Sequence, residues 1–396
     1  MLASAAIAGC SVGHAGSGPA AGVFLGDVRP IVHGSLTAGQ VAGEETAFGL
    51  QLLGRICAAA PTTNAAVSPA SVAQTIGMLE AGARGSTRRA VSRVLHLPDW
   101  SPALVAALHD QTAAVSRGAQ VAVSNHLFEQ RGVTPAKATL DDLRAGFRAD
   151  LRTVDFARHN AEATAAINKT VNDDTHGLIG KLFDEPLDSS TTTVAADALY
   201  LHAKWQTPFE PALPAPFHTA DGKTVNRPTM QGDALQAPMR SAAGWQSVTL
   251  PYQGRHLQAV ALLPPPPAAT CAAPSAGTLL ALTTGPSQRT AGVELPSLHL
   301  SQTLDLKHTL ASLGLPLAGD YTGLGAAGVH ISKIVQKVVM NVDEKGTTAA
   351  AATGAVTATS AVVPHSLVRF NRPFLFLIED TATKTPLFLT YIADSG

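Results

Sequence analysis

The sequence contains few charged residues: Asp, Glu, Lys and Arg make up 14% of its 396 residues, against about one quarter in an ordinary soluble protein. The 28 basic and 29 acidic residues nearly cancel, so the chain lacks the basic surface that nucleic-acid binding requires. Aromatic residues are also scarce, at 5%, and the core must therefore consist mainly of Ala, Val and Leu. No uninterrupted run of about 18 apolar residues occurs, which excludes a spanning helix in the body of the chain.

Motifs for catalysis and for cofactor binding are missing as well. No GxSxG, HExxH, P-loop or dinucleotide-binding glycine motif stands out, and the three cysteines do not have the spacing of metal ligands. We therefore expect no metal, no cofactor and no enzymatic activity. Cys57 lies in a helical pattern and is expected to be a buried thiol; a disulfide with Cys271, in a Pro/Ala/Ser-rich stretch, is the alternative.

Cys10 differs from the other two cysteines because it ends a short apolar stretch and precedes a Gly/Ser-rich segment. Ile7-Ala8-Gly9-Cys10 resembles the lipobox of bacterial lipoproteins, in which small residues admit a signal peptidase and the cysteine then receives lipid. No basic segment precedes this stretch, as a signal peptide requires, so a chance run of small residues is the alternative. The resemblance predicts a leader and linker over 1–40 and a bacterial protein of the cell envelope or the extracellular space. Its only membrane contact would be a lipid on Cys10.

The remaining chain, 41–396, reads as one α+β domain in which helices come first and strands later. Ser68 and Pro69 have the residue types of a helix N-cap and first position, and a further helix is expected to be capped by Ser86 or Thr87. Hydrophobic periodicity predicts other helices over 44–59 and 161–171, and strands over 121–128, 192–201, 245–250, 257–263, 331–342, 375–378 and 387–392.

One segment does not suit a stable domain. After the strand predicted over 331–342, the chain continues as Asp343-Glu344-Lys345-Gly346-Thr347-Thr348 and four alanines, without any large side chain up to about residue 366. This composition is compatible with a flexible surface loop. The alternative is a segment that slides between two existing strands, which needs small residues because a bulky or charged side chain would clash in a packed interior.

The segment 344–352 resembles the hinge of the reactive-centre loop of serpins, and Phe370-Asn371-Arg372-Pro373-Phe374 resembles the C-terminal signature of that family. Further blocks similar to serpins follow the family's order, so that the resemblance covers about residues 45–396. They are Ser68-Pro69-Ala70-Ser71-Val72, Gly82-Ala83-Arg84-Gly85-Ser86-Thr87 and Ala198-Leu199-Tyr200-Leu201-His202-Ala203-Lys204-Trp205, with weaker support from Asn125-His126-Leu127-Phe128, Val154-Asp155-Phe156 and Ile167-Asn168.

The resemblance implies a serpin fold of three β-sheets and eight to nine helices with an exposed reactive-centre loop over about 344–368. It implies a monomeric inhibitor whose partner is a target serine protease. The protease cleaves the loop and forms a covalent acyl complex, and the cleaved loop then inserts as a new central strand. The hinge residues are those of inhibitory members, since they are small or permit a turn: Glu344, Gly346, Thr347, Ala349, Ala350, Ala351 and Ala352.

The family's spacing places the scissile bond between Ser360 and Ala361 when counted from the hinge, and at Val362 when counted back from Pro373. No Arg, Lys or aromatic residue occurs in the window 357–362. We therefore expect an elastase- or subtilisin-like protease with a small specificity pocket.

Two regions that control opening of the central sheet in serpins have counterparts here. Ser68 and Ser71 match the shutter beneath the sheet, and Trp205 matches the breach where the loop enters. Where the family usually has an Asn and a His in the shutter, this sequence places Asp197 and Gln336. This departure leaves a non-inhibitory, serpin-like surface binding protein as the alternative function.

Overall fold

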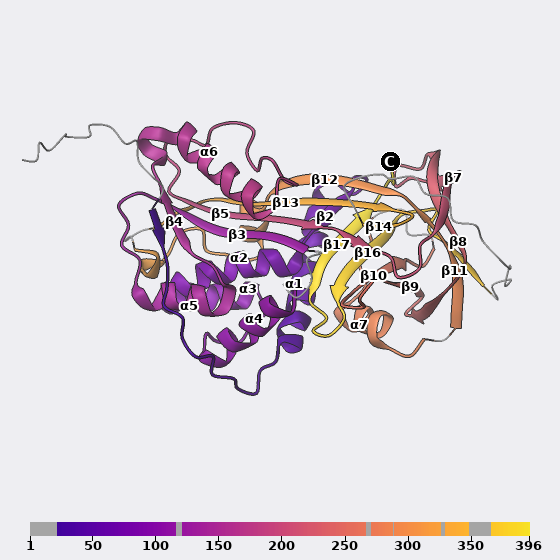
Figure 1. Ribbon diagram of the computed structural model, residues 1–396, viewed down its shortest axis with the longest axis horizontal. Coiled ribbons are helices and arrows are strands. Elements are labelled where there is room, and N and C mark those ends of the chain that lie inside the picture. Colours follow the sequence, from indigo (N-terminus) through magenta and orange to yellow (C-terminus); the bar gives the residue numbers. More distant parts are fainter. Residues whose placement is uncertain (1–21, 116–120, 267–270, 288, 326–328, 348–365) are drawn as a thin grey trace, which may run out of the picture.

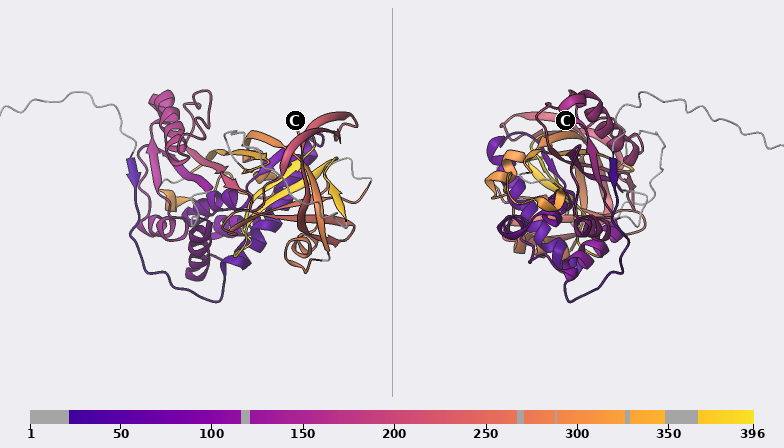
Figure 2. Two further views of the ribbon diagram at one scale, coloured as in Figure 1. Left: turned by 45° about the vertical axis from the view of Figure 1, so that its right-hand side comes forward. Right: turned by 90° about the vertical axis from the view of Figure 1, so that its left-hand side faces the viewer.

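The computed structural model describes residues 22–115, 121–266, 271–287, 289–325, 329–347 and 366–396. They form an α+β fold, as expected, in which most helices lie at one end and strands make up most of the other (Figure 1, Figure 2). Its α-helices are α1 (Ala38–Ala59), α2 (Pro69–Gly82), α3 (Gly85–Val94), α4 (Pro102–Val115), α5 (Lys137–Phe147), α6 (Phe156–Asp174), α7 (Ala276–Thr284) and α8 (Lys307–Ser312), with a 3-10 turn at Thr322–Leu324. None of the helices within these ranges is long and apolar enough to cross a membrane.

The first sheet runs along the molecule beneath α6 (Figure 1). In spatial order it contains β1 (Gly22–Phe24), β4 (Leu151–Val154), β3 (Val121–Gln130), β5 (Thr193–Leu201), β13 (Ile331–Asp343) and β12 (Leu298–Asp305). The central pair, β5 and β13, is parallel, although β5 is antiparallel to β3 and β13 is antiparallel to β12. Two short strands, β14 (Gly346–Thr347) and β6 (Ala203–Lys204), extend this sheet at one end.

The other two sheets share one long strand, β8 (Thr224–Ala242). Its first part pairs with β7 (Glu210–His218) and its middle part with β11 (Arg289–Pro296), and β15 (Leu367–Arg369) adds to β11 in parallel. Its last part pairs with β9 (Trp245–Pro251), which continues through β10 (Leu257–Leu263), β16 (Phe374–Asp380), β17 (Pro386–Ile392) and β2 (Ala65–Val67).

The middle of the first sheet is covered on both faces. All nine residues of β5 are buried, because α6 packs on one face of the sheet and α2 lies against the other (Figure 1). Helix α2 is itself buried along its whole length, since it lies between this sheet and the neighbouring helices. This explains its lack of a polar face. As predicted, Ser68 caps α2 by accepting a hydrogen bond from the Ser71 amide, and Pro69 is its first residue.

The beginning of the described chain differs from the linker expected over 1–40. Strand β1 pairs with β4, and the Asp27 carboxylate lies 2.5 Å from Lys137 Nζ on α5. The prediction for the cap of α3 was wrong, because Arg84 precedes the helix without a side-chain cap. The Thr87 hydroxyl is instead the acceptor for the Asp320 amide.

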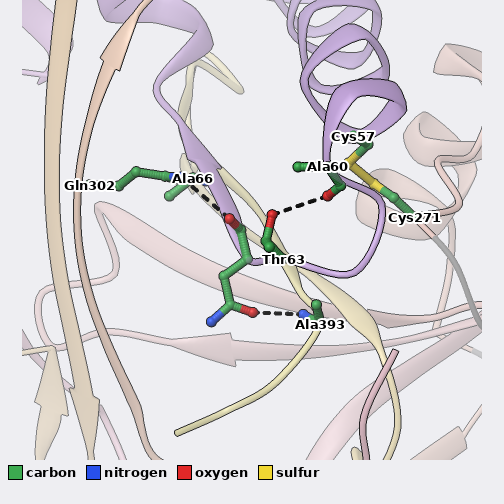
Figure 3. The surroundings of a disulfide bond; sticks show 8 residues. Cys57, Ala60, Thr63, Ala66, Cys271, Gln302 and Ala393 are labelled. Carbon is green, nitrogen blue, oxygen red and sulfur yellow. Dashed lines mark hydrogen bonds between the residues drawn. A yellow bond between two sulfur atoms is a disulfide. The ribbon is translucent and has the colours of Figure 1, made fainter. Parts of the chain in front are cut away.

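A disulfide joins Cys57 in the last turn of α1 to Cys271, which precedes α7 (Figure 3). The expectation of a free, buried thiol at Cys57 was therefore wrong, and the alternative holds. The two Cα atoms are 5.8 Å apart, although the residues are separated by 214 positions. The disulfide thus fixes the end of α1 to the segment between β10 and α7.

Removing this cross-link should destabilise the fold, since the closed loop is long and the unfolded chain regains its freedom. We expect the double substitution Cys57→Ala/Cys271→Ala to lower the free energy of unfolding by about 2–4 kcal/mol, measured by guanidinium denaturation. Dithiothreitol should lower the stability of the wild type by a similar amount and leave the double variant unchanged. Equal stability of wild type and variant without reductant would contradict this account.

Candidate functional site

The segment after β13 turns sharply and returns as the two-residue strand β14. The Asp343 carboxylate closes this turn by accepting hydrogen bonds from the amides of Lys345 at 2.8 Å and Gly346 at 3.0 Å. Strand β14 then pairs on one side with β13 and on the other with β6. The first two residues that follow the turn therefore already occupy a strand position between β13 and β6.

Gly346 is required by the closeness of the neighbouring backbone. A Cβ atom at this position would lie 2.1 Å from the Ala203 carbonyl oxygen and 2.6 Å from Lys204 Cα. Any other residue would force β14 away from β6. The glycine expected at the hinge is thus a condition for its strand pairing, as well as for its turn.

The backbone of the turn is held from the side by the segment that follows β6. The Trp205 amide donates to the Lys345 carbonyl at 2.8 Å, and the Trp205 indole donates to the Asp343 carbonyl at 2.9 Å. Glu344 is held twice, since its carbonyl accepts from the Phe209 amide and its carboxylate from the Ala212 amide. Trp205, expected at the point of loop entry, therefore contacts the hinge directly.

Tyr252 completes this contact and was not found from the sequence. Its ring stacks on Trp205 with centroids 4.4 Å apart, and its hydroxyl lies 2.8 Å from the Thr347 hydroxyl. All three side chains are almost fully buried, and burial raises the pKa of Tyr252, which stays a neutral phenol. No spacing or motif around Tyr252 indicates this role; only the fold brings it to Thr347.

Below Thr347 the sheet is closed. Strands β5 and β13 pair directly from Val339 opposite Tyr200 down to Ile331 opposite Thr193. A strand that continued from β14 along this line would have to separate β5 from β13. Its backbone groups would then bond to both neighbours, as those of Gly346 and Thr347 already do.

The residues expected to form the shutter meet at the middle of this closed pair. Gln336 on β13 lies directly opposite Asp197 on β5, and its amide group donates to the Asp197 carboxylate. The same Gln336 side chain accepts from the Ser68 amide at 2.9 Å and donates to the Ser68 carbonyl at 3.2 Å. Ser71 donates its hydroxyl to the other oxygen of Asp197 and lies 2.9 Å from the Asn125 side chain. Ser68, Ser71, Asp197 and Gln336 are thus one cluster that ties both central strands to the start of α2.

Burial dominates the electrostatics of this cluster. Asp197 is 2% exposed, and desolvation raises the pKa of its carboxyl to about 7, although the hydrogen bonds from Ser71 and Gln336 favour the ionised form. At neutral pH the carboxyl is therefore close to its midpoint between the acid and the carboxylate. An Asn at this position would carry no such charge.

Several predicted site residues lie outside the described residues. They are the hinge alanines Ala349, Ala350, Ala351 and Ala352, the scissile-bond residues Ser360, Ala361 and Val362, and Cys10. The described chain leaves the first sheet at Thr347 and resumes beside β11 at Leu367, so the two ends of the expected loop belong to different sheets (Figure 1).

Comparison with known proteins agrees with the family resemblance that the sequence motifs indicate. A family model described as "Serpin (serine protease inhibitor)" matches residues 44–395. The chain is 31% identical to iripin-2 of Ixodes ricinus over 364 residues, which is 86% of this chain and 90% of that protein. It is also 31% identical to the leukocyte elastase inhibitor of Sus scrofa over 376 residues, 88% and 98% of the two chains. In structure it resembles native tengpin, a thermophilic serpin, with a TM-score of 0.81, 21% identity and coverage of 93% and 97%. The expected fold of three sheets is confirmed.

The raised pKa of Asp197 predicts a pH-dependent stability. Between its ordinary pKa of about 4 and its folded pKa of about 7 the folded chain retains a proton that the unfolded chain releases, so stability falls as pH rises through this window. Asp197→Asn removes the charge. The variant should therefore gain stability relative to wild type as the pH rises from about 4 to about 7, by at most about 4 kcal/mol.

Guanidinium unfolding of both proteins at several pH values measures this difference. The buried carboxyls of Glu45 and Glu129, whose pKa values burial raises to about 8, contribute equally to both proteins and cancel. A hydrogen bond lost in the variant would shift the difference by a constant amount. A difference that does not change with pH would show that Asp197 is not the titrating group.

Proposed function

We propose, because the chain belongs to the serpin family of serine protease inhibitors, that it traps a serine protease as a suicide substrate by insertion of its cleaved loop. The protease serine would attack the carbonyl carbon of Ser360, or of Val362 in the alternative register. The peptide bond to the next residue would break, its amine would leave with a proton from the protease histidine, and an ester would join the two proteins. The inhibitor would supply the substrate and the protease all the catalytic groups.

The observation that carries this proposal is the position of β14. Gly346 and Thr347 lie between β13 and β6 at the top of a closed pair of parallel strands. Each residue that followed Thr347 into this line would add main-chain hydrogen bonds, each worth a net stabilisation of about 1 kcal/mol. Ten or more inserted residues would thus add about 10 kcal/mol of stabilisation, and this free energy would drive the movement and distortion of the bound protease.

The side chains that would follow Thr347 support insertion. Thr347 is fully buried, and along a strand every second residue returns to the same face. Ala349 and Ala351 would therefore face the interior after Thr347, where a methyl group is accommodated and a charge is not. This is the basis for assigning an inhibitory hinge.

The target proposed is an elastase- or subtilisin-like protease with a small specificity pocket. The window 357–362 contains only small or medium-sized uncharged residues, Thr, Ala, Ser and Val. One curated relative, at 31% identity, is named leukocyte elastase inhibitor, which supports the same class of target.

Incubation with pancreatic elastase and with subtilisin tests the mechanism. We expect a complex that survives boiling in SDS and that is larger than the chain by the mass of the protease. Mass spectrometry of the released C-terminal peptide should place the cut after Ser360, or at Val362 in the alternative register. Cleavage of the loop without a complex would contradict inhibition and favour a non-inhibitory binding protein.

Charged substitutions in the hinge separate insertion from simple cleavage. Thr347→Glu and Ala351→Glu should both convert the inhibitor into a substrate, because each would bury a carboxylate under the sheet. Thr347 is packed in the described structure, so its substitution could also impair folding; Ala351 lies outside the described residues, and Ala351→Glu therefore tests insertion separately from folding. Thr348→Glu is the matched control: its side chain would face the opposite side, and it should retain complex formation. Inhibition by the Ala351 variant equal to that of wild type would refute the insertion account.

We propose further that the protein acts as a monomer at a bacterial cell envelope or outside the cell, held by lipid on Cys10. The resemblance of residues 7–10 to a lipobox supports this location. After expression in a bacterium, the mature N-terminal peptide should begin at Cys10 and carry the added mass of the lipid. Cys10→Ser should remain unprocessed. A full-length, unmodified wild-type chain in the cytosol would contradict the lipid anchor.

A further inference from the structure

A pocket of about 510 Å³ is lined by Trp205 and Phe209, the two residues that hold the hinge backbone. It lies between the segment that follows β6, the bend of β8 at 235–238, and the adjoining ends of β9 and β10. Its volume is that of a small-molecule site. A backbone hydrogen bond joins two of the lining segments, since the Gln206 amide donates to the Pro251 carbonyl.

One wall of the pocket is apolar and partly aromatic. The rings of Trp205 and Phe209 meet edge to face with centroids 6.0 Å apart, and Leu235, Leu250 and Pro251 also line the pocket. A wall of this kind suits a flat or acyl hydrocarbon body of modest size.

The pocket is also lined by two cations. Arg240 and Arg255 both line the pocket, and no Asp or Glu of the described chain does. Arg240 is oriented by hydrogen bonds from Nε to the Gly285 carbonyl at 2.5 Å and from Nη1 to the Thr249 hydroxyl at 2.8 Å, and its Nη2 donates to no described residue. Among the described residues, the Arg255 guanidinium donates from Nε alone, to the Gln206 side chain at 3.2 Å. Guanidinium donors therefore remain available to a ligand.

The carboxyl of Glu379 already has partners of its own. Its carboxyl accepts from Gln258 at 2.7 Å and lies 3.4 Å from Lys384 Nζ, and although its charge acts on Arg240, it is buried and does not line the pocket. It leaves the two arginines as the charged groups that a ligand would meet. An arginine pair beside an apolar wall matches one carboxylate or sulfonate attached to a hydrophobic body.

We propose that this pocket binds an amphipathic organic anion, and that its occupancy slows insertion of the loop. The coupling follows from Trp205 and Phe209, which line the pocket and also hold the hinge: the Trp205 indole donates to the Asp343 carbonyl, and the amides of Trp205 and Phe209 donate to the carbonyls of Lys345 and Glu344. A ligand packed against these rings stabilises the arrangement in which the hinge is held at β14. The coupling rests on the proposed inhibition, whereas the binding site does not.

Two fluorescent probes that differ by one charged group test the site. Anilinonaphthalene sulfonate should bind at a single saturable site and accept energy transfer from tryptophan, and the uncharged N-phenylnaphthylamine should bind at least about tenfold more weakly. Arg255→Gln, at an exposed residue, should weaken sulfonate binding about tenfold and leave binding of the uncharged probe unchanged. Arg55→Gln, at an exposed residue of α1 remote from the pocket, is the matched control and should bind both probes as wild type does. Equal binding of the two probes, or sulfonate binding insensitive to Arg255→Gln, would overturn the site.

The coupling is measured separately, as the number of inhibitor molecules consumed per protease molecule. Saturating sulfonate should raise this number severalfold in wild type, because slower insertion lets more loops be cleaved without trapping the protease. Arg255→Gln should reduce this effect at the same probe concentration. Unchanged consumption in a protein that does form complexes would refute the coupling. If no complex with the protease forms at all, the proposed inhibitory function is refuted. The effect of Arg255→Gln on sulfonate binding then still tests whether the pocket binds an anion.

Discussion

The line of main-chain hydrogen bonds between β5 and β13 is the constraint on which the rest of the structure depends. Two parallel strands are closed along this line, yet β14 already separates β13 from β6 immediately above it. Helices α6 and α2, which pack on the two faces of the sheet, and the polar cluster at the start of α2 all contact the closed pair of strands β5 and β13. An ordinary domain gains nothing from such an arrangement, whereas a domain that accepts a further strand needs both the closed pair and the strand that begins to divide it.

The polar cluster on this line has two opposing effects on the stability of the closed pair of strands. Gln336 joins β13 to the backbone of Ser68 with two hydrogen bonds and reaches Asp197 across the strand boundary, which favours the closed pair. Asp197 contributes a carboxyl whose ionisation is penalised by burial, which weakens the closed state as the group loses its proton. The substitution of the family's usual Asn and His by Asp and Gln therefore preserves a connected network while adding a charge that depends on pH.

Local sequence patterns predicted the elements in which the alternation of apolar and polar residues follows from burial. Strand β10 has the predicted bounds, β5 differs by one residue, and Ser68 caps α2 as its sequence indicates. Strand β7 was missed because it contains three prolines at an edge of its sheet, where alternation of apolar residues is weak. The cap of α3 was mistaken because Thr87 is used by Asp320, 233 positions away. The disulfide and the contact of Tyr252 with Thr347 likewise depend on long-range packing, which no local pattern carries.

The scarcity of aromatic residues gives the hinge its particular character. In a core built mostly from small aliphatic side chains, Trp205, Phe209 and Tyr252 are gathered at the one place where the loop segment joins the first sheet. Tyr252 and the Trp205 indole bond to the hinge, and Trp205 and Phe209 also line the pocket together with Arg240 and Arg255. The Trp205 ring thus takes part in both structures, since its indole donates to the hinge and its side chain lines the pocket. A movement of this ring would change the hydrogen bond that holds the Asp343 carbonyl and the shape of the pocket together, which is the physical basis of the coupling proposed between them.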